Sequence, residues 1–293
     1  MPKATVLVVD DEALIRWSLS ERLKSEGYDV LEADTGHAAR AVALAYAFGS
    51  QHIKTRTFRR WDINARFIAE AHRRGMRATG HCAHPLPLVA AGMDAKEHAG
   101  FCTERGDVVA YDDLIQLYRT AGIVVVPTIS VSSFAVWMYD QPKLLQEDAE
   151  LAPFLGPRAD FAWMLKLGKA GRREWDRFTR VARETTAKLA RAGVTIGTGS
   201  DIWQIPTGAH LELEELVAAG LSPVEAIHAA TGAAARVVGA ERDLGTIEVD
   251  KLADLILLDA DPQSDIRNTR RIRAVMQSGG WIDRDAIRAQ YQK

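Results

Sequence analysis

The chain has 293 residues, of which 47% are hydrophobic and 26% are charged, and its formal net charge is −2. This composition is typical of a globular protein, and the length suits either two ordinary domains or one α/β barrel. With no block of like charges and no run approaching about 18 apolar residues, the sequence argues against nucleic-acid binding and against a membrane span.

Cysteine usage bears on the cellular compartment. The two cysteines, Cys82 and Cys102, are not spaced as a metal-binding pair, and the N-terminus shows no signal-peptide pattern. These features favour reduced thiols and a cytoplasmic location. Cys82 follows His81, which raises the alternative of a nucleophile, although a small, partly buried thiol is the commoner state of such a residue.

The first fifty residues alternate between strand and helix patterns. A continuous β-branched run predicts a strand buried on both faces, and Asp10 and Asp11 come directly after it. Glycines close both predicted helices. The pattern predicts strands over residues 4–9 and 28–31 and helices over residues 13–26 and 36–48.

This opening resembles the receiver domain of response regulators over about residues 1–40, carried by Val-Leu-Val-Val-Asp-Asp-Glu-Ala-Leu-Ile-Arg and Gly-Tyr-Asp-Val-Leu-Glu-Ala. The resemblance implies that Asp10 and Asp11 would hold Mg²⁺ beside a phosphorylatable aspartate at the end of the third strand. The candidate third strand, residues 51–57, has no carboxylate, so phosphorelay function is disfavoured. Two carboxylates at a strand end could still attract a divalent cation through oxygen ligation.

From residue 51 onward, short apolar runs again alternate with amphipathic segments. Helix starts are indicated at Asp62, Asp112 and His210, and a capping box with proline at the first helical position begins at Ser222. The tail becomes rich in β-forming residues. The pattern predicts strands over residues 51–57, 76–81, 93–98, 123–127, 194–197, 244–247, 253–258, 272–276 and 281–282, and further helices over residues 85–91 and 172–192.

The region from 129 to 171 has the weakest periodicity. It carries several aromatic residues among prolines and charges. An aromatic insertion after a strand often forms a lid or a pocket wall, but ordinary core packing explains the same composition equally well.

Four chemically capable side chains come at the ends of predicted strands. They are Lys54, His81, His98 and Asp201, the last after the glycine-rich segment Gly193-Val-Thr-Ile-Gly-Thr-Gly-Ser-Asp201. In parallel α/β sheets and barrels, chemistry collects at the carboxyl ends of the strands. Neutral imidazole and carboxylate are standard ligands for Zn²⁺ and similar ions, and a carboxylate beside such an ion can act as a general base.

A single histidine on a strand is usually structural, so the case for a site rests on two histidines and an aspartate at the same end of successive strands. We expect a metal site there. His210, at the head of a helix, is a candidate for the substrate pocket. His84 and His228 have no such placement and are assigned no role.

Eight short segments between residues 51 and 284 share one family pattern: His52-Ile-Lys54, Glu70-Ala-His-Arg-Arg-Gly75, Thr79-Gly-His81, Ala91-Gly-Met-Asp-Ala-Lys-Glu-His98, Gly193 to Asp201, Leu221-Ser-Pro-Val-Glu-Ala-Ile, Leu244-Gly-Thr-Ile and Lys251-Leu-Ala-Asp-Leu-Ile-Leu-Leu-Asp259. Through them the sequence from about residue 51 to 284 resembles the amidohydrolase superfamily, especially its imidazolonepropionase-like and prolidase-like members. The resemblance implies that Lys54 would be carbamylated and bridge two divalent metal ions, expected to be zinc, and that His81 and His98 would hold the second ion. Asp201 would bind the first ion and act as acid and base.

The sequence departs from that family at its front. The family's first strand supplies a His-x-His pair to the first metal ion, and this sequence contains no His-x-His. About seven parallel strands are predicted where a closed barrel needs eight. We therefore expect an α/β, TIM-barrel-like metal-hydrolase domain, incomplete and chimeric in appearance. Its expected parts are a receiver-like βαβα segment at 1–50 standing in for the first barrel units, a barrel portion at 51–240 and a small, partial β-sandwich tail at 241–293.

These features favour a metal-dependent hydrolase that cleaves a C–N bond in a small amide, cyclic amide or dipeptide, with catalysis impaired by the loss of His-x-His. Asp10 and Asp11 are candidates for partly replacing the missing histidines. The alternatives are a degenerate, non-catalytic barrel and a receiver-type signalling or binding protein. Strand edges left open by the missing half of the sandwich favour a homo-oligomer.

Overall fold

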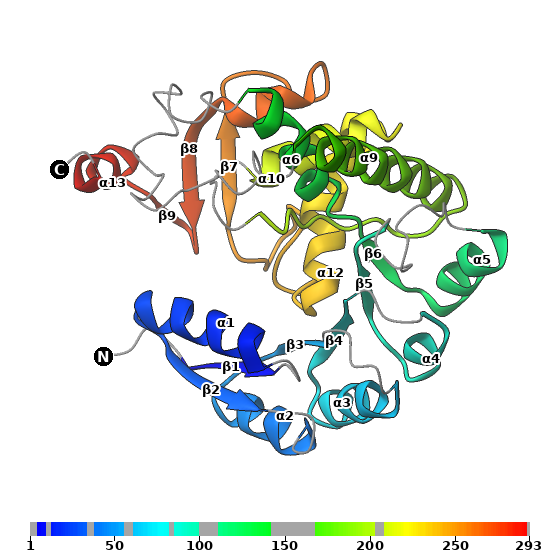
Figure 1. The fold of residues 1–293 in the computed structure, drawn as a ribbon. Helices are drawn as coiled ribbons and strands as arrows, with labels where there is room; N and C mark the ends of the chain where they lie inside the picture. Colours follow the sequence, from blue (N-terminus) through cyan, green and yellow to red (C-terminus); the bar gives the residue numbers. More distant parts are fainter. Residues whose placement is uncertain are drawn as a thin grey trace.

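The computed structural model describes residues 5–9, 13–33, 38–55, 61–81, 85–99, 111–141, 168–202 and 208–291. Short parallel strands run through the body of the molecule with helices around them, and a small antiparallel sheet lies near the C-terminus (Figure 1). None of the described helices is long and apolar enough to cross a membrane.

The first two strands pair with each other in parallel, with Thr5 opposite Asp29 and Val9 opposite Ala33. The helices end at glycines with positive φ, as predicted. Val42 of the second helix belongs to the same buried core as Ile68 of the third. These elements are β1 (Thr5–Val9), α1 (Ala13–Ser25), β2 (Asp29–Ala33) and α2 (Ala38–Ala47).

A second parallel sheet, in the order β3-β4-β5-β6, forms the centre of the fold. Its strands and intervening helices lie where the sequence predicted them, except that the third helix begins one residue earlier, so Asp62 lies in its first turn and is not the cap. The elements are β3 (His52–Thr55), α3 (Trp61–Arg73), β4 (Arg77–Gly80), α4 (Pro85–Ala90), β5 (Ala95–Glu97), α5 (Asp112–Ala121) and β6 (Val124–Val126).

The register of this sheet places the strand ends together. Lys54 pairs with Thr79, Thr79 with Ala95, and Ala95 with Val124. Because all four strands run in the same direction, their carboxyl ends meet at one edge. Helices cover the sheet on the outside, where Phe67, Ile68 and Leu189 contribute to the main core.

The segments beyond β6 include a helix and a strand that local patterns described poorly. The region from residue 129, which has the weakest periodicity in the sequence, begins with helix α6 (Ile129–Asp140). Its sequence is apolar on nearly every side, and it buries Phe134 and Met138 in a second small core, so a one-sided pattern never appears. The predicted strand 194–197 is reduced to one parallel bridge between Val125 and Ile196.

The long helix α9 (Gly168–Arg191) precedes that bridge, and α10 (Gly208–Ala218) follows it. The capping box at Ser222 is confirmed: its hydroxyl accepts from the backbone N–H of Glu225, whose carboxylate accepts from the backbone N–H of Ser222. Helix α11 (Pro223–His228) continues through one π-helical turn, η3 (Ala229–Ala233), into α12 (Ala234–Val238).

The C-terminal tail is an antiparallel sheet in the order β7-β8-β9, in agreement with the predicted β-rich tail. Residues 244–247, predicted as a strand, are bends followed by irregular backbone. The first strand of this sheet is largely exposed, with Ile256 60% accessible. The elements are β7 (Leu255–Leu258), η4 (Ile266–Arg270), β8 (Ile272–Gln277), β9 (Gly280–Trp281) and α13 (Arg284–Tyr291).

The parallel strands do not close into a barrel within the described part of the chain. β1 and β2 form one sheet, β3 to β6 another, and Ile196 adds a single bridge to β6. The fold is therefore α/β with a parallel sheet and a small antiparallel sheet at its end, as expected, and its barrel is open among these residues.

Candidate metal centre

The four side chains singled out at the strand ends lie at the same edge of the central sheet. Lys54 is in β3, and His81 and His98 directly follow β4 and β5. The backbone N–H of His81 donates to Thr55 O at 2.8 Å, and that of His98 donates to Val126 O at 2.9 Å. Both histidines are therefore held by the parallel ladder, on regular structure that fixes their positions.

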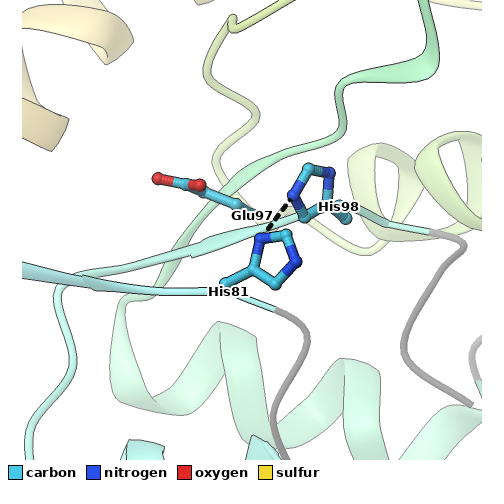
Figure 2. Close-up of side chains that lie close together, drawn as sticks. All are labelled: His81, Glu97 and His98. Atoms are coloured by element: carbon cyan, nitrogen blue, oxygen red, sulfur yellow. Dashed lines mark hydrogen bonds between the residues drawn. The ribbon is translucent and has the colours of Figure 1, made fainter. Parts of the chain in front are cut away.

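The two imidazoles face each other at this edge (Figure 2). Nδ1 of His81 and Nε2 of His98 are 2.8 Å apart, and the ring planes meet at 82°. Ligand atoms of His81, Glu97 and His98 all lie within 4.8 Å of one another. Two imidazole nitrogens and a carboxylate oxygen are a donor set suited to Zn²⁺ and related ions, so the residues present fit a divalent cation.

Glu97 is the member of this cluster that the sequence analysis missed. Its carboxylate forms an ion pair with Lys54 Nζ and accepts a 3.0 Å hydrogen bond from Thr79 Oγ1. The register explains the contact: Lys54 is opposite Thr79, Thr79 is opposite Ala95, and Glu97 lies two residues beyond Ala95 on the same face. The period-2 count from Ala95 is the signal that could have found it.

His98 comes directly after Glu97, and strand alternation alone would send their side chains to opposite faces. The backbone of His98 is left-handed, with φ 65°, and this turn ends the alternation. Thr128 and Asp201, each with φ 51°, share this conformation. Of the five non-glycine residues with positive φ in the described stretches, three therefore lie at this edge. Such conformations are costly and tend to cluster at functional sites.

Hydrogen bonding defines the protonation of the His98 ring. The Thr128 hydroxyl donates its one hydrogen to Pro127 O at 2.8 Å, so it accepts at 2.6 Å from Nδ1 of His98. The proton therefore lies on Nδ1, and the lone pair lies on Nε2, the atom that faces His81. In histidines that bind metals, the ring nitrogen that does not contact the metal usually donates its hydrogen to a fixed acceptor, as Nδ1 of His98 does here.

Asp201 approaches the same nitrogen. Its Oδ2 atom is 3.7 Å from Nε2 of His98, and its side chain is 41% exposed while that of His98 is 4% exposed. Asp201 is thus far more open to solvent than the buried imidazole that it approaches. A carboxylate in that position can orient a water molecule and accept its proton.

The remaining predicted positions fall elsewhere. Nδ1 of His210 lies 3.0 Å from Thr269 Oγ1, which ties α10 to the C-terminal segment. Burial, with a smaller contribution from the charge of Arg270, lowers the pKa of His210. Asp10 and Asp11 lie outside the described residues.

Several other positions discussed from the sequence are also outside the described stretches: His84, Cys82, Cys102 and the aromatic residues of 142–167. Of the aromatic residues that are described, Phe134 is buried beside Trp137 and Trp175 in the second core. Core packing is therefore the role of Phe134.

A cavity of about 200 Å³ lies at the opposite end of the sheet, lined by residues that begin the strands and by Arg236. There Asp94 accepts hydrogen bonds from His72, Arg77 and the backbone of Ala78. Burial opposes ionisation of Asp94, but these bonds outweigh it and hold its pKa below the usual value. Interactions at the amino ends of barrel strands usually serve stability.

Comparison with known proteins assigns the family. The sequence model of the amidohydrolase family matches residues 62–282, three quarters of the chain. The chain belongs to the amidohydrolase family. A comparison with curated proteins gives no match.

Solved structures agree with this amidohydrolase fold. A Xaa-Pro dipeptidase with bound methionine aligns with a TM-score of 0.65 and 21% identity, over 95% of this chain and 75% of that one. Molinate hydrolase aligns with a TM-score of 0.62 and 17% identity, over 96% and 72%. Ochratoxinase from A. niger aligns with a TM-score of 0.65 and 22% identity, over 86% and 55%. At these identities the likeness shows the fold.

The comparisons bear on the front of the chain as well. The family match begins at residue 62, and nothing in the comparisons supports a receiver-like origin for the residues before it. The structural alignment with the dipeptidase extends over 95% of this amidohydrolase chain. Most of the first strands and helices therefore superpose on elements of the same fold.

Proposed function

We propose that this amidohydrolase is a metal-dependent hydrolase that cleaves a C–N bond in a small amide, cyclic amide or dipeptide. The observation that carries the proposal is the imidazole pair formed by half-buried His81 and buried His98, Nδ1 to Nε2 at 2.8 Å, with Oδ2 of Asp201 3.7 Å from the same Nε2. The similarity of the fold to a Xaa-Pro dipeptidase and to molinate hydrolase supports a hydrolase of this kind.

In this proposal His81 and His98 hold a divalent cation, with zinc as the first ion to test. The cation supplies Lewis acidity toward a substrate carbonyl. Asp201 holds a water molecule through Oδ2 and takes its proton. His98 is enclosed, with 4% of its side chain exposed, whereas Asp201 reaches solvent, with 41% exposed.

Lys54 has two alternative roles in this site. As the structure stands, its ammonium group pairs with Glu97, and Glu97 is then the third protein ligand available to a cation. A carbamylated Lys54 would instead be an anion and would repel the Glu97 carboxylate. The two arrangements are mutually exclusive at one ion, and bicarbonate during metal loading would favour the second.

We expect turnover to be weak, because no His-x-His pair exists in the sequence to bind a first metal ion. The positions of the groups around a metal ion control its reactivity. A site that lacks a pair of ligands is therefore expected to turn over substrate more slowly. The same absence favours one alternative, a barrel that binds a ligand without converting it.

A hydrolysis screen tests the proposal. The zinc-loaded protein, prepared with bicarbonate, would be assayed against amides, cyclic amides and dipeptides, beside Asp201→Asn and the matched control Asp259→Asn, whose partner Arg273 lies in the tail. Asp201→Asn is expected to lower the rate by at least about 100-fold and the control to leave it unchanged. Equal rates in Asp201→Asn and wild type would contradict the proposed role, and absence of any turnover would favour the ligand-binding alternative.

A further inference from the structure

A buried carboxylate lies behind the candidate metal centre. Glu212, on α10, has no measurable exposure and belongs to the fully buried side chains of the protein. It lies four residues after buried Gly208 and four before buried Leu216, so it is on the core-facing line of the helix. Burying a carboxyl group is costly unless its oxygens are hydrogen-bonded, so this placement calls for specific partners.

Those partners are at the start of α6. Glu212 Oε1 accepts from the backbone N–H of Ile129 at 3.1 Å, and Oε2 accepts from the backbone N–H of Ser130 at 2.7 Å. The first N–H groups of a helix have no partner within the helix and favour a negative or strongly accepting group. Glu212 supplies that group from 82 residues away in sequence and thereby fixes the start of α6.

The start of α6 contacts the candidate metal centre through two side chains. Thr128, which precedes the helix, accepts from Nδ1 of His98 at 2.6 Å and holds a left-handed conformation to do so. Ser130 Oγ donates to Ser200 O at 3.2 Å, and Ser200 directly precedes Asp201. The turn that begins α6 therefore reaches His98 through Thr128, and it reaches the residue before Asp201 through Ser130.

We propose that Glu212 is the positioning residue of this site: by anchoring the Thr128–Ser130 turn, it sets the ring orientation of His98 and the approach of Asp201. The inference rests on the proposed function where metal binding is concerned. Its geometric part, the fixed orientation and tautomer of His98, stands independently of any metal ion.

The natural first variant is Glu212→Gln, which keeps the shape of the side chain but places an amide N–H₂ against one of the two backbone donors. The matched control is Glu70→Gln. Glu70 is another buried carboxylate, on α3, whose ion-pair partners Arg73 and Arg74 lie on its own helix or directly after it. Loss of stability common to both variants would reflect burial alone.

Two measurements separate positioning from stability. The first is the nitrogen NMR spectrum of the histidine rings in the metal-free protein: His98 is expected as one neutral tautomer with the proton on Nδ1 in wild type and Glu70→Gln, and as a mixture in Glu212→Gln. The second is a Zn²⁺ titration by calorimetry, in which Glu212→Gln is expected to bind about 10- to 100-fold more weakly than the control. An unchanged tautomer together with unchanged affinity would overturn the inference.

Thr128→Val keeps the test decisive if Glu212→Gln fails to fold. This variant leaves Glu212 and its two backbone bonds intact and removes only the hydroxyl that meets His98. It is expected to reproduce the mixed tautomer, while Thr128→Ser retains the wild-type spectrum. A single Nδ1–H tautomer in Thr128→Val would show that the turn does not set His98 and would overturn the inference.

The tautomer spectrum and the Zn²⁺ titration together also separate the positioning role of Glu212 from metal-dependent hydrolysis. If wild type binds no Zn²⁺ yet its His98 tautomer is fixed and is lost in the variants, metal-dependent hydrolysis fails and the positioning role is supported. If wild type binds Zn²⁺ through His81 and His98 but Glu212→Gln changes neither readout, the proposed function survives and the positioning role is overturned.

Discussion

Lys54 and Glu97 form an ion pair although their strands are not neighbours, because β4 lies between β3 and β5. The pair spans β4 on the face where Thr79 donates to the same carboxylate. A cation from one strand, a carboxylate from another and two histidines thus gather at one edge. The ligand set available to a metal ion therefore includes Glu97, a residue that the family resemblance did not imply.

Replacing Glu97 tests whether it is a ligand. Glu97→Gln removes the charge while keeping the shape, and we expect Zn²⁺ affinity to fall about 10- to 100-fold, as for other groups that support a metal. Isothermal titration measures this change. Glu241→Gln is the matched control, because Glu241 pairs with Arg77 at the opposite end of the sheet. Equal affinities in the two variants would show that Glu97 is only the partner of Lys54.

The buried carboxyl group of Glu212 predicts a pH dependence of stability. Burial raises its pKa to about 7 from an ordinary value of 4.5, against the lowering effect of its bonds to Ser130 and Ile129. Between pH 4.5 and 7 the unfolded chain releases this proton while the folded protein retains it. The free energy of unfolding therefore falls across that window, by roughly 3 kcal/mol from this group.

Urea unfolding of wild type and Glu212→Gln at a series of pH values between 4 and 8, about 0.5 units apart, checks this sign. The difference in unfolding free energy between the two proteins isolates Glu212 from other groups, such as Asp94, whose lowered pKa acts in the opposite sense at lower pH. A difference that does not change from pH 5 to 8 would contradict the assignment.

Packing next to His81 predicts a stability loss at Gly80. A Cβ added there would lie 2.4 Å from Met93 Sδ and 3.0 Å from Leu88 Cδ1, both buried. Gly80→Ala is therefore expected to destabilise the protein by about 1–3 kcal/mol through overpacking. Gly280→Ala meets only Gln277 O at 3.6 Å and is expected to stay within about 0.5 kcal/mol of wild type. Thermal or urea unfolding compares the two, and similar losses would contradict the packing argument.

The sequence predicted the elements whose cause is local. Glycine-terminated helices, the capping box at Ser222 and the buried strands each follow from short patterns, and the strand ends brought His81 and His98 into view. The parallel order of β3 to β6 follows from the same alternation. The family resemblance is confirmed by the match over residues 62–282.

The residues that were missed depend on distant contacts or on unusual backbone. Strand alternation would place Glu97 and His98 on opposite faces, and the left-handed backbone of His98 brings the two side chains together. Glu212 stands among Leu211, Leu213 and other glutamates of α10, and only the packing of α6 against that helix makes it a core residue. Closure of the sheet depends on pairing between segments far apart in the chain, which no local pattern specifies.

The central claim is that the strand ends bind a divalent metal through His81 and His98, and metal analysis tests it most directly. The protein would be purified without chelator, loaded with Zn²⁺, dialysed and measured beside His81→Ala/His98→Ala and the control His228→Ala, an exposed histidine on α11. We predict at least one equivalent of zinc in wild type and control and a loss of that zinc in the double variant. Equal zinc in all three proteins, or none in wild type, would contradict the account.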